Sequence, residues 1–473
     1  MSIISRIKQK NTLLLCGLAV LLAFPNFIRI FDNNFWGDEA FSIRLAKMSF
    51  ADMLVATAED VHPPLYYWIL QMFYNIAGDN GIIYHFASVL PYLISMILAL
   101  TVIRKWFSDS AAIIFMVLCS LEENAVNFNV EVRMYSWGAL FLLLSFLALY
   151  RILRVNDTKA YAYFVLASLA CAYTHYYCLV SVTFFYFVLI VKALTERKAY
   201  LGKVLIACLV TVVGYLPWCF VLLQTFKRTM SDFWMTQIPY VKECIAFFFS
   251  GKMQYLLFAI MLLAIACFVW KEQKNTAMVF LLSAGVCSLF GTILIGNMVS
   301  RLFRPVFIVR YLYPVCVIAW ILMAIGIAGC KHRKVLTTIL VIVLLCVRIP
   351  AYLRVYQEEK VQDLLLGETL AATMEINEVE AIILTDLQSI EWTVAEYYYP
   401  KAECKLVDIT NIPILQGKRN YYLILSDELQ AYEIEQFSKQ GYKIETLISD
   451  GALGTIPVAA YSLQSDIVES VNN

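Results

Sequence analysis

Long apolar runs separated by short polar connections dominate the first 352 residues of this chain. The 473-residue sequence is 61% hydrophobic and 15% charged, and its mean hydropathy is +0.70. A soluble core could not bury so much apolar surface, whereas runs of about 20 residues cross a bilayer as helices. The sequence therefore predicts a polytopic α-helical membrane protein with about 11 transmembrane helices. The predicted spans are residues 11–31, 86–103, 111–127, 134–153, 161–174, 176–194, 204–225, 253–270, 277–297, 306–328 and 335–352.

Charges in the connections predict how the chain is oriented. Five connections are basic, and such connections stay in the cytoplasm under the positive-inside rule. The N-terminus is therefore expected in the cytoplasm, before a first span that is retained and not cleaved. Under this orientation the polar motifs described below share the external face of the plasma membrane. The basic connections are residues 104–105, 151–159, 192–203, 271–274 and 331–334.

From Leu353 onward the composition becomes that of a soluble domain. We predict a transmembrane domain over residues 1–352, whose external loop 32–85 carries two motifs, and an extracytoplasmic α/β domain over residues 353–473. Apolar runs predict its strands, and amphipathic runs its helices. The strands are expected at residues 381–384, 421–425 and 442–448, with 458–463 as an additional last strand, and the helices at 389–399 and 427–440.

Composition also excludes some functions. The net charge of +1 argues against a nucleic-acid-binding protein, which usually carries a concentrated basic face. Most of the 13 cysteines lie inside apolar runs, and none forms a Cys-x-x-Cys pair. We therefore expect small apolar side chains there, without a disulfide framework or a zinc knuckle.

An acidic pair follows the first span, within Phe35-Trp36-Gly37-Asp38-Glu39-Ala40. A single acid near a membrane surface is most often a solvated loop residue. A carboxylate held in a loop at the membrane interface can instead accept a proton from an attacking hydroxyl group. We expect Asp38 and Glu39 to lie in such a loop and to be the catalytic pair.

His62 precedes Pro63, Pro64 and Leu65. Proline fixes its own φ and favours extended geometry in the residue before it, so the chain itself aims the imidazole. The start of a helix over residues 65–77 would explain the prolines but not the histidine. Contact with a phosphate or with a metal ion would explain His62.

Three further polar residues are candidates for binding substrate or metal. Glu131 and Arg133 precede the span 134–153, where they either flank the helix end or face a ligand. His175 separates two apolar runs and is either a hydrogen-bonded structural residue or a partner of an acid or a metal. With four histidines and no His-x-x-His spacing, no dedicated metal site is predicted.

Arg301, Arg304 and Arg310 are exceptions to the positive-inside pattern, because they place cations on the predicted external side. A requirement for an anion would explain them, since arginine binds phosphate with two parallel hydrogen bonds. Arg310 starts the sequence Arg310-Tyr311-Leu312-Tyr313-Pro314 within a span. It either snorkels to the surface or is buried against an anion.

At these residues the chain resembles the GT-C fold glycosyltransferases that use polyprenyl-phosphate sugars, the protein O-mannosyltransferase and aminoarabinose transferase superfamily. The resemblance rests on four motifs and on the layout of about 11 helices with an external C-terminal domain. It implies that Asp38, with Glu39 beside it, is the base, and that His62 lies near the donor phosphate. It also implies that Arg310, supported by Arg301 and Arg304, holds the lipid phosphate. The motifs are Asp38-Glu39, His62-Pro63-Pro64-Leu65, Glu131-Val132-Arg133-Met134-Tyr135 and Arg310-Tyr311-Leu312-Tyr313-Pro314.

The resemblance predicts an inverting, bacterial, family 39-like glycosyltransferase that moves a sugar from a polyprenyl-phosphate donor to an envelope acceptor. No β-trefoil insertion is present in a central loop, so a protein acceptor is not specifically indicated. No cofactor is required. A divalent metal (Mg²⁺, Mn²⁺ or Zn²⁺) on Glu39 or Glu131 remains open.

Two alternatives share these features. A lipid-linked-sugar flippase or other transporter would place ionisable residues or broken helices near mid-membrane, often in repeated halves. The charges here gather at the outer surface and no repeat is visible, which favours surface chemistry. A ligase that transfers whole glycan chains differs mainly in the size of its donor.

Overall fold

The computed structural model describes residues 3–32, 34–196, 200–231, 235–373, 382–385, 392–406, 422–426, 431–439 and 441–465. Its elements form two compact units. The first comprises Met1–Ile30 with Met48–Tyr352, and the second comprises Phe31–Lys47 with Leu353–Asn473. The predicted division fell at residue 352, but the structure also groups the segment around Asp38 with the C-terminal unit.

Within the described residues, nine helices are long and apolar enough to cross a membrane. The predicted span 111–127 corresponds to a shorter helix, α7 (Asp109–Leu121), of 13 residues, and the predicted span 161–174 corresponds to α10 (Thr158–Thr174), of 17 residues. Neither helix is among these nine. The polytopic helical fold is thus confirmed, while the number 11 is not. The long helices are α1 (Ile3–Ile28), α5 (Gly81–Leu98, continued by η2 Ala99–Ile103 and α6 Arg104–Trp106), α9 (Tyr135–Val155), α11 (Tyr176–Thr195), α12 (Leu201–Ser231), α14 (Gln254–Lys271), α15 (Thr276–Leu302), α16 (Tyr313–Ala328, preceded by η4 Val309–Leu312) and α17 (Arg333–Ala372).

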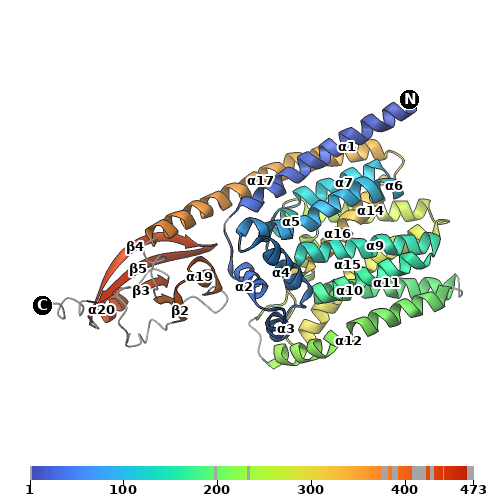
Figure 1. Cartoon of the computed structure of the whole chain (residues 1–473). Helices are drawn as coiled ribbons and strands as arrows, with labels where there is room; N and C mark the ends of the chain where they lie inside the picture. The colour runs from blue at the N-terminus through green and yellow to red at the C-terminus, as the bar shows by residue number, and fades with distance from the viewer. Residues whose placement is uncertain are drawn as a thin grey trace. The chain divides into compact units, whose positions relative to one another are not determined.

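Helix α16 is the core of the helical unit. Every residue from Tyr313 to Ala328 is buried, and the helix packs against α7, α9, α14 and α15 (Figure 1). A helix that is apolar all round belongs in such a position, because it has no face to offer to water. Helices α12 and α14 are far more exposed, as expected of helices that face lipid.

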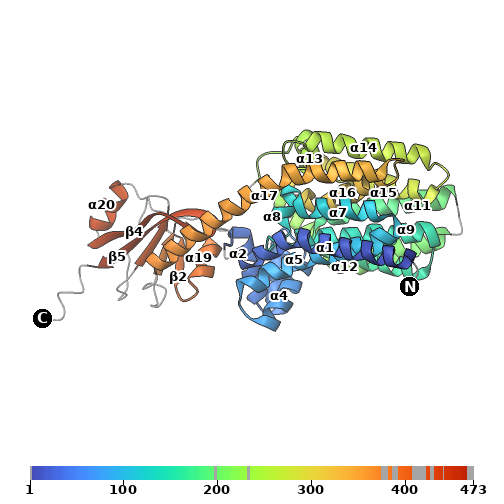
Figure 2. The same ribbon diagram turned by 90° about the horizontal axis from the view of Figure 1, so that it is seen from above.

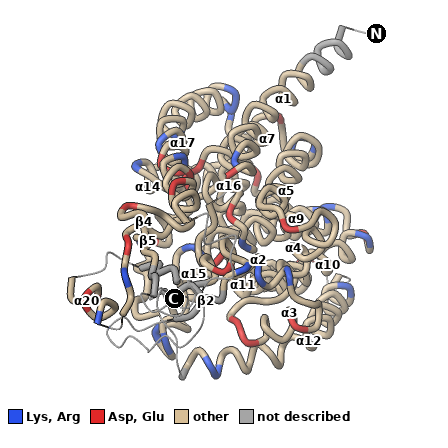
Figure 3. Tube along the Cα trace, turned by 60° about the vertical axis from the view of Figure 1, so that its left-hand side comes forward, with Lys and Arg blue, Asp and Glu red and all other residues tan. Residues whose placement is uncertain are grey.

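The basic connections lie together at one end of this unit. Lys203 donates a hydrogen bond to the Asn156 carbonyl oxygen, and Lys271 donates one to that of Gly329. Lys192 likewise contacts Thr276. Figure 3 shows lysine and arginine mainly at helix ends and in connections. Helices α9, α11 and α16 therefore begin at the opposite end, where the predicted site residues are.

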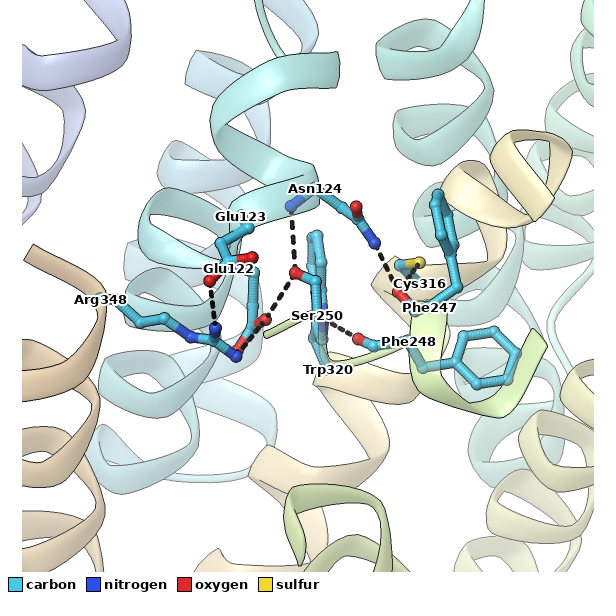
Figure 4. Close-up of polar contacts among 9 residues, drawn as sticks. All are labelled: Glu122, Glu123, Asn124, Phe247, Phe248, Ser250, Cys316, Trp320 and Arg348. Atoms are coloured by element: carbon cyan, nitrogen blue, oxygen red, sulfur yellow. Dashed lines mark hydrogen bonds and ion pairs between the residues drawn. The ribbon is translucent and has the colours of Figure 1, made fainter. Parts of the chain in front are cut away.

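A buried ion cluster joins four segments near that opposite end (Figure 4). Arg348 of α17 is 1% exposed; it donates to both carboxylate oxygens of Glu122, at 3.1 and 2.9 Å, and to Glu123 at 3.1 Å. Ser250 bridges Glu122 and the backbone N–H of Asn124. Gly251 has φ +79°, and a Cβ there would overlap Arg348 and Glu123. Glycine therefore fits both the backbone conformation and the close approach.

The segment after Glu122 is held on several sides. It contains α8 (Glu123–Phe128) and then a short irregular stretch that ends where α9 begins. Arg29 donates to the Val126 carbonyl oxygen, and His85 contacts that of Val130 at 3.0 Å. Tyr313 donates to Asn129 at 2.7 Å. These contacts fix the backbone that carries Glu131 and Arg133.

The second unit contains a five-stranded sheet in the order β2-β1-β3-β5-β4 (Figure 2). Strands β2, β1 and β3 are parallel, while β5 is antiparallel to both β3 and β4. The predicted α/β domain is confirmed, although β2 was not expected. Residues 381, 389–391, 421, 427–430 and 440 of the predicted strands and helices lie outside the described residues. The elements are β1 (Ile382–Thr385), α19 (Trp392–Tyr398), β2 (Glu403–Leu406), β3 (Tyr422–Ser426), α20 (Ala431–Lys439), β4 (Tyr442–Leu453) and β5 (Ile456–Ser465).

We expect the charge cluster to be necessary for the stability of the helical unit. Arg348→Met should lower the free energy of unfolding by about 3–5 kcal/mol, because it leaves Glu122 buried without its cation. Adding Glu122→Gln should recover much of this loss. The measurement is unfolding in mixed detergent micelles, followed by tryptophan fluorescence.

The matched control is Arg354→Met, which removes an exposed arginine from the same helix. It should change the stability by no more than about 0.5 kcal/mol. Equal losses in the two arginine variants would contradict the role of the cluster.

Candidate active site

Asp38 and Glu39 lie in the first turn of a helix, α2 (Gly37–Lys47), and not in a loop as predicted. Glu39 accepts a hydrogen bond from the Trp36 backbone N–H at 3.1 Å, which is half of a capping box. Both acids are 5% exposed. Glu39 therefore has a structural role as a helix cap, and Asp38 is the better candidate for chemistry.

The second unit holds this helix tightly. Asp32 pairs with Lys360 at 2.9 Å, Thr393 donates to the Gly37 carbonyl oxygen, and Tyr398 accepts from the Phe35 N–H. Ala40 packs in a core with residues of α17, α19, β4 and β5. The carboxylate of Asp38 is thus carried by the C-terminal unit, a grouping that spacing in the sequence does not reveal.

His62 lies in the turn between α3 (Phe50–Glu59) and α4 (Leu65–Ala77), and α4 begins where the two prolines predicted. The imidazole is buried and stacks on that of His175, with ring centroids 5.5 Å apart. The Tyr311 ring lies edge-on to His62 at 5.8 Å. Three residues distant in sequence therefore meet at one end of the helical unit.

His175 has two separate roles in this arrangement. It is the N-cap of α11, and its Nδ1 accepts a hydrogen bond from the Tyr177 backbone N–H at 3.2 Å. An accepting Nδ1 places the proton of the neutral ring on Nε2. That Nε2 is buried and has no hydrogen-bond partner among the described residues. A buried donor without a protein acceptor indicates a place for a ligand or water oxygen.

Arg133 and Arg310 set the electrostatics of the histidine pair. Burial lowers the pKa of His62 well below its ordinary value. The charge of Arg133, the charge that His175 would carry if protonated, and the charge of Arg310 lower it further. Burial also lowers the pKa of His175 to about 3, again with contributions from Arg133 and Arg310. Both imidazoles are therefore neutral near pH 7, so the arginines carry the positive charge of the site.

Tyrosines complete this cluster. Tyr311 lies 5.0 Å from His175 and stacks on Tyr177 at 5.6 Å, measured between ring centroids. The Tyr135 ring lies 5.9 Å from His175, and its hydroxyl group is buried without a hydrogen-bond partner among the described residues. Sequence reasoning missed Tyr135 and Tyr177 as site residues. Tyr135 ends the motif that contains Arg133, and Tyr177 follows His175 by two residues, but neither tyrosine was singled out.

A cavity of about 250 Å³ opens beside the histidine pair. Its polar end is formed by His62, His175 and the tyrosines Tyr177 and Tyr311. Its walls are apolar and come mainly from α11, α12 and α15, including Leu222 and Val299. The cavity therefore offers polar donors at one end and an apolar lining along the rest.

The remaining candidates, Arg301, Arg304 and Glu131, do not line this cavity. Arg301 is exposed in the last turn of α15, and Arg304 is half-buried in the connection that follows. Glu131 is half-buried, and its backbone carbonyl oxygen accepts from the Arg133 N–H at 2.7 Å. Among the described residues, no group of three or more His, Cys, Asp or Glu side chains could hold a metal ion.

Comparison with known proteins agrees with the motif analysis. Residues 61–218 match the model of the family described as dolichyl-phosphate-mannose-protein mannosyltransferase. This third of the chain contains His62, Arg133 and His175. The search of curated protein sequences finds no match.

Two solved structures of ArnT from Cupriavidus metallidurans have a similar fold. The apo structure matches with a TM-score of 0.59 at 12% identity, covering 96% of this chain and 98% of that chain. The structure bound to undecaprenyl phosphate matches with a TM-score of 0.59 at 12% identity, covering 95% and 97%. At this identity the likeness shows the fold. The chain thus has the GT-C fold of ArnT, and its family match indicates a membrane glycosyltransferase, as the motifs predicted.

Proposed function

We propose that this chain is an inverting glycosyltransferase that moves a sugar from a polyprenyl-phosphate donor to an acceptor of the cell envelope, on the external face of the membrane. The observation that carries the proposal is the neutral histidine pair flanked by Arg133 and Arg310 at the polar end of an apolar cavity. An amphiphile with a phosphate head and an isoprenoid tail has the same distribution of charge and apolar surface. The ArnT structure bound to undecaprenyl phosphate supports this class of lipid.

Each polar group has a role in this proposal. Arg310 and Arg133 bind the phosphate as cations, and His62 and His175 bind it as neutral hydrogen-bond donors. The charge on the phosphate oxygens increases when the sugar leaves. Donors that are already in place stabilise that charge most in the transition state.

The reaction replaces the glycosyl phosphate bond of the donor with a glycosidic bond to the acceptor. The acceptor oxygen attacks the anomeric carbon, and the bond from that carbon to the phosphate oxygen breaks. The bonding electron pair remains on polyprenyl phosphate, which is the leaving group. Asp38, assigned as base from the sequence motif, takes the proton of the acceptor hydroxyl group. The configuration at the anomeric carbon inverts because the acceptor attacks from the side opposite the phosphate.

We expect Arg310→Gln and Arg133→Gln each to lower sugar transfer by about 100-fold or more, because each removes a cation from the leaving phosphate. Asp38→Asn should lower transfer comparably while donor binding persists. The assay is transfer from radiolabelled undecaprenyl-phosphate hexoses by purified protein in detergent. The control is Lys227→Gln, which removes an exposed charge near the C-terminal end of α12 and should retain activity.

Another outcome would favour a carrier. Donor that binds or crosses vesicle membranes without forming product, and that is unaffected by Asp38→Asn, would overturn the transferase assignment and support a flippase.

Two substitutions separate the roles of His175. Asparagine can also accept the Tyr177 N–H as an N-cap, but it lacks the Nε2 donor, so His175→Asn should fold normally and lose about 10- to 100-fold in activity. His175→Ala loses the cap as well, and its free energy of unfolding should fall by about 1 kcal/mol more. Full activity in the asparagine variant would show that Nε2 does not contact the reacting group.

The depressed histidine pKa values predict a pH dependence of stability. The folded chain keeps both imidazoles neutral, whereas the unfolded chain protonates them below about pH 6.5. Stability should therefore fall as pH decreases from 6.5, by up to about 1.4 kcal/mol per pH unit for each histidine. Unfolding between pH 4.5 and 7.5 should show a shallower slope in His175→Asn. Equal slopes in the wild type and in His175→Asn would contradict the assignment.

A further inference from the structure

The basic end of the helical unit contains two kinds of connection. Three connections hold an acidic partner close to a cation. The pairs are Arg104–Asp109 at 2.6 Å, Arg151–Asp157 at 2.8 Å and Lys192–Glu196 at 2.6 Å. In these connections part of the positive charge required by the positive-inside rule is neutralised within the protein.

The other two connections are not neutralised in this way. Lys271, Lys331 and Arg333 line a common cavity of about 530 Å³, in which Glu272 is the only acidic lining residue. Among the described residues, none of these three cations forms an ion pair with a carboxylate. Lys271 donates only to the Gly329 carbonyl oxygen, at 3.3 Å. The cavity lining thus carries a formal excess of positive charge.

Aromatic and aliphatic side chains also line this cavity. Trp106 and Phe107 contribute aromatic rings from the end of α6, and Phe268 and Ile325 contribute apolar surface from α14 and α16. Tryptophan at a helix end is typical of the level of lipid headgroups. A lipid has both matching parts: its phosphate would contact the cations of the lining, and its acyl chains would contact the apolar side chains.

We propose that this cavity binds the phosphate headgroup of an acidic phospholipid from the leaflet at the basic end of the helices. Basic pockets between transmembrane helices bind such headgroups by charge attraction and hydrogen bonding. The site lies at the opposite end of α16 from the histidine pair, so it is separate from the proposed donor site. Its occupant would fix the ends of α14 and α16 and the start of α17 relative to one another.

The test is the thermal unfolding midpoint of the purified protein in neutral detergent, titrated with dioleoylphosphatidylglycerol. The lipid should raise the midpoint in a saturable manner, whereas phosphatidylcholine and millimolar inorganic phosphate should not. The double variant Lys331→Gln/Arg333→Gln should bind at least about tenfold more weakly. The charge-retaining variant Lys331→Arg/Arg333→Lys should restore binding.

Lys159→Gln/Lys203→Gln removes one cation from each of two other basic connections and should bind as the wild type does. An equal loss in this control and in the cavity variant would show diffuse attraction to the basic end and overturn the proposal. A matching stabilisation by inorganic phosphate would identify a soluble anion as the ligand and likewise overturn it. Sugar transfer is not the readout, so the result is independent of the proposed reaction.

Discussion

The chain can bury Arg348 inside an apolar bundle only because Glu122 and Glu123 meet it there. A guanidinium group in that position would otherwise be strongly destabilising, and its two terminal nitrogens donate to the carboxylates of Glu122 and Glu123. Ser250 in turn donates a hydrogen bond to Glu122. The pairing also fixes the start of the segment that follows Glu122. Contacts from Arg29, His85 and Tyr313 then hold the rest of that segment. Its last residues include Arg133, so the charge cluster indirectly places a cation of the candidate site.

The site combines cations that cannot lose their charge with imidazoles that do not gain one. Arginine stays protonated at any physiological pH, and burial beside two arginines keeps His62 and His175 neutral. A phosphate bound there would meet positive charge from the arginines and directed hydrogen bonds from the histidines.

The motifs revealed some of these features and not others. The prolines after His62 correctly predicted the start of α4, because proline restricts the local backbone. The acidic pair was expected in a loop, but Gly37–Lys47 forms a helix that packs on α17, α19 and the sheet. Those partners come from a part of the chain more than 300 residues away, so local propensity could not show the contact. The predicted span 111–127 was too long, because α7 ends at Leu121, directly before the polar residues Glu122, Glu123 and Asn124. The predicted span 161–174 ends where α10 ends, at Thr174.

The sequence by itself determined the class of protein, the approximate spans and the end of the bundle that carries the basic connections. These properties depend on the hydropathy and charge of each segment, which decide whether that segment crosses the bilayer and in which orientation. Only the tertiary structure decided that Arg133, His62, His175 and Arg310 lie near one another and that the pKa values of both histidines are lowered. Those features depend on burial and on distances between side chains from different helices, and a pKa responds to that environment rather than to neighbours in sequence. The tertiary structure also decided that Asp38 is carried by the C-terminal unit, because the packing of Ala40 against Leu366 and Val394 is a long-range contact.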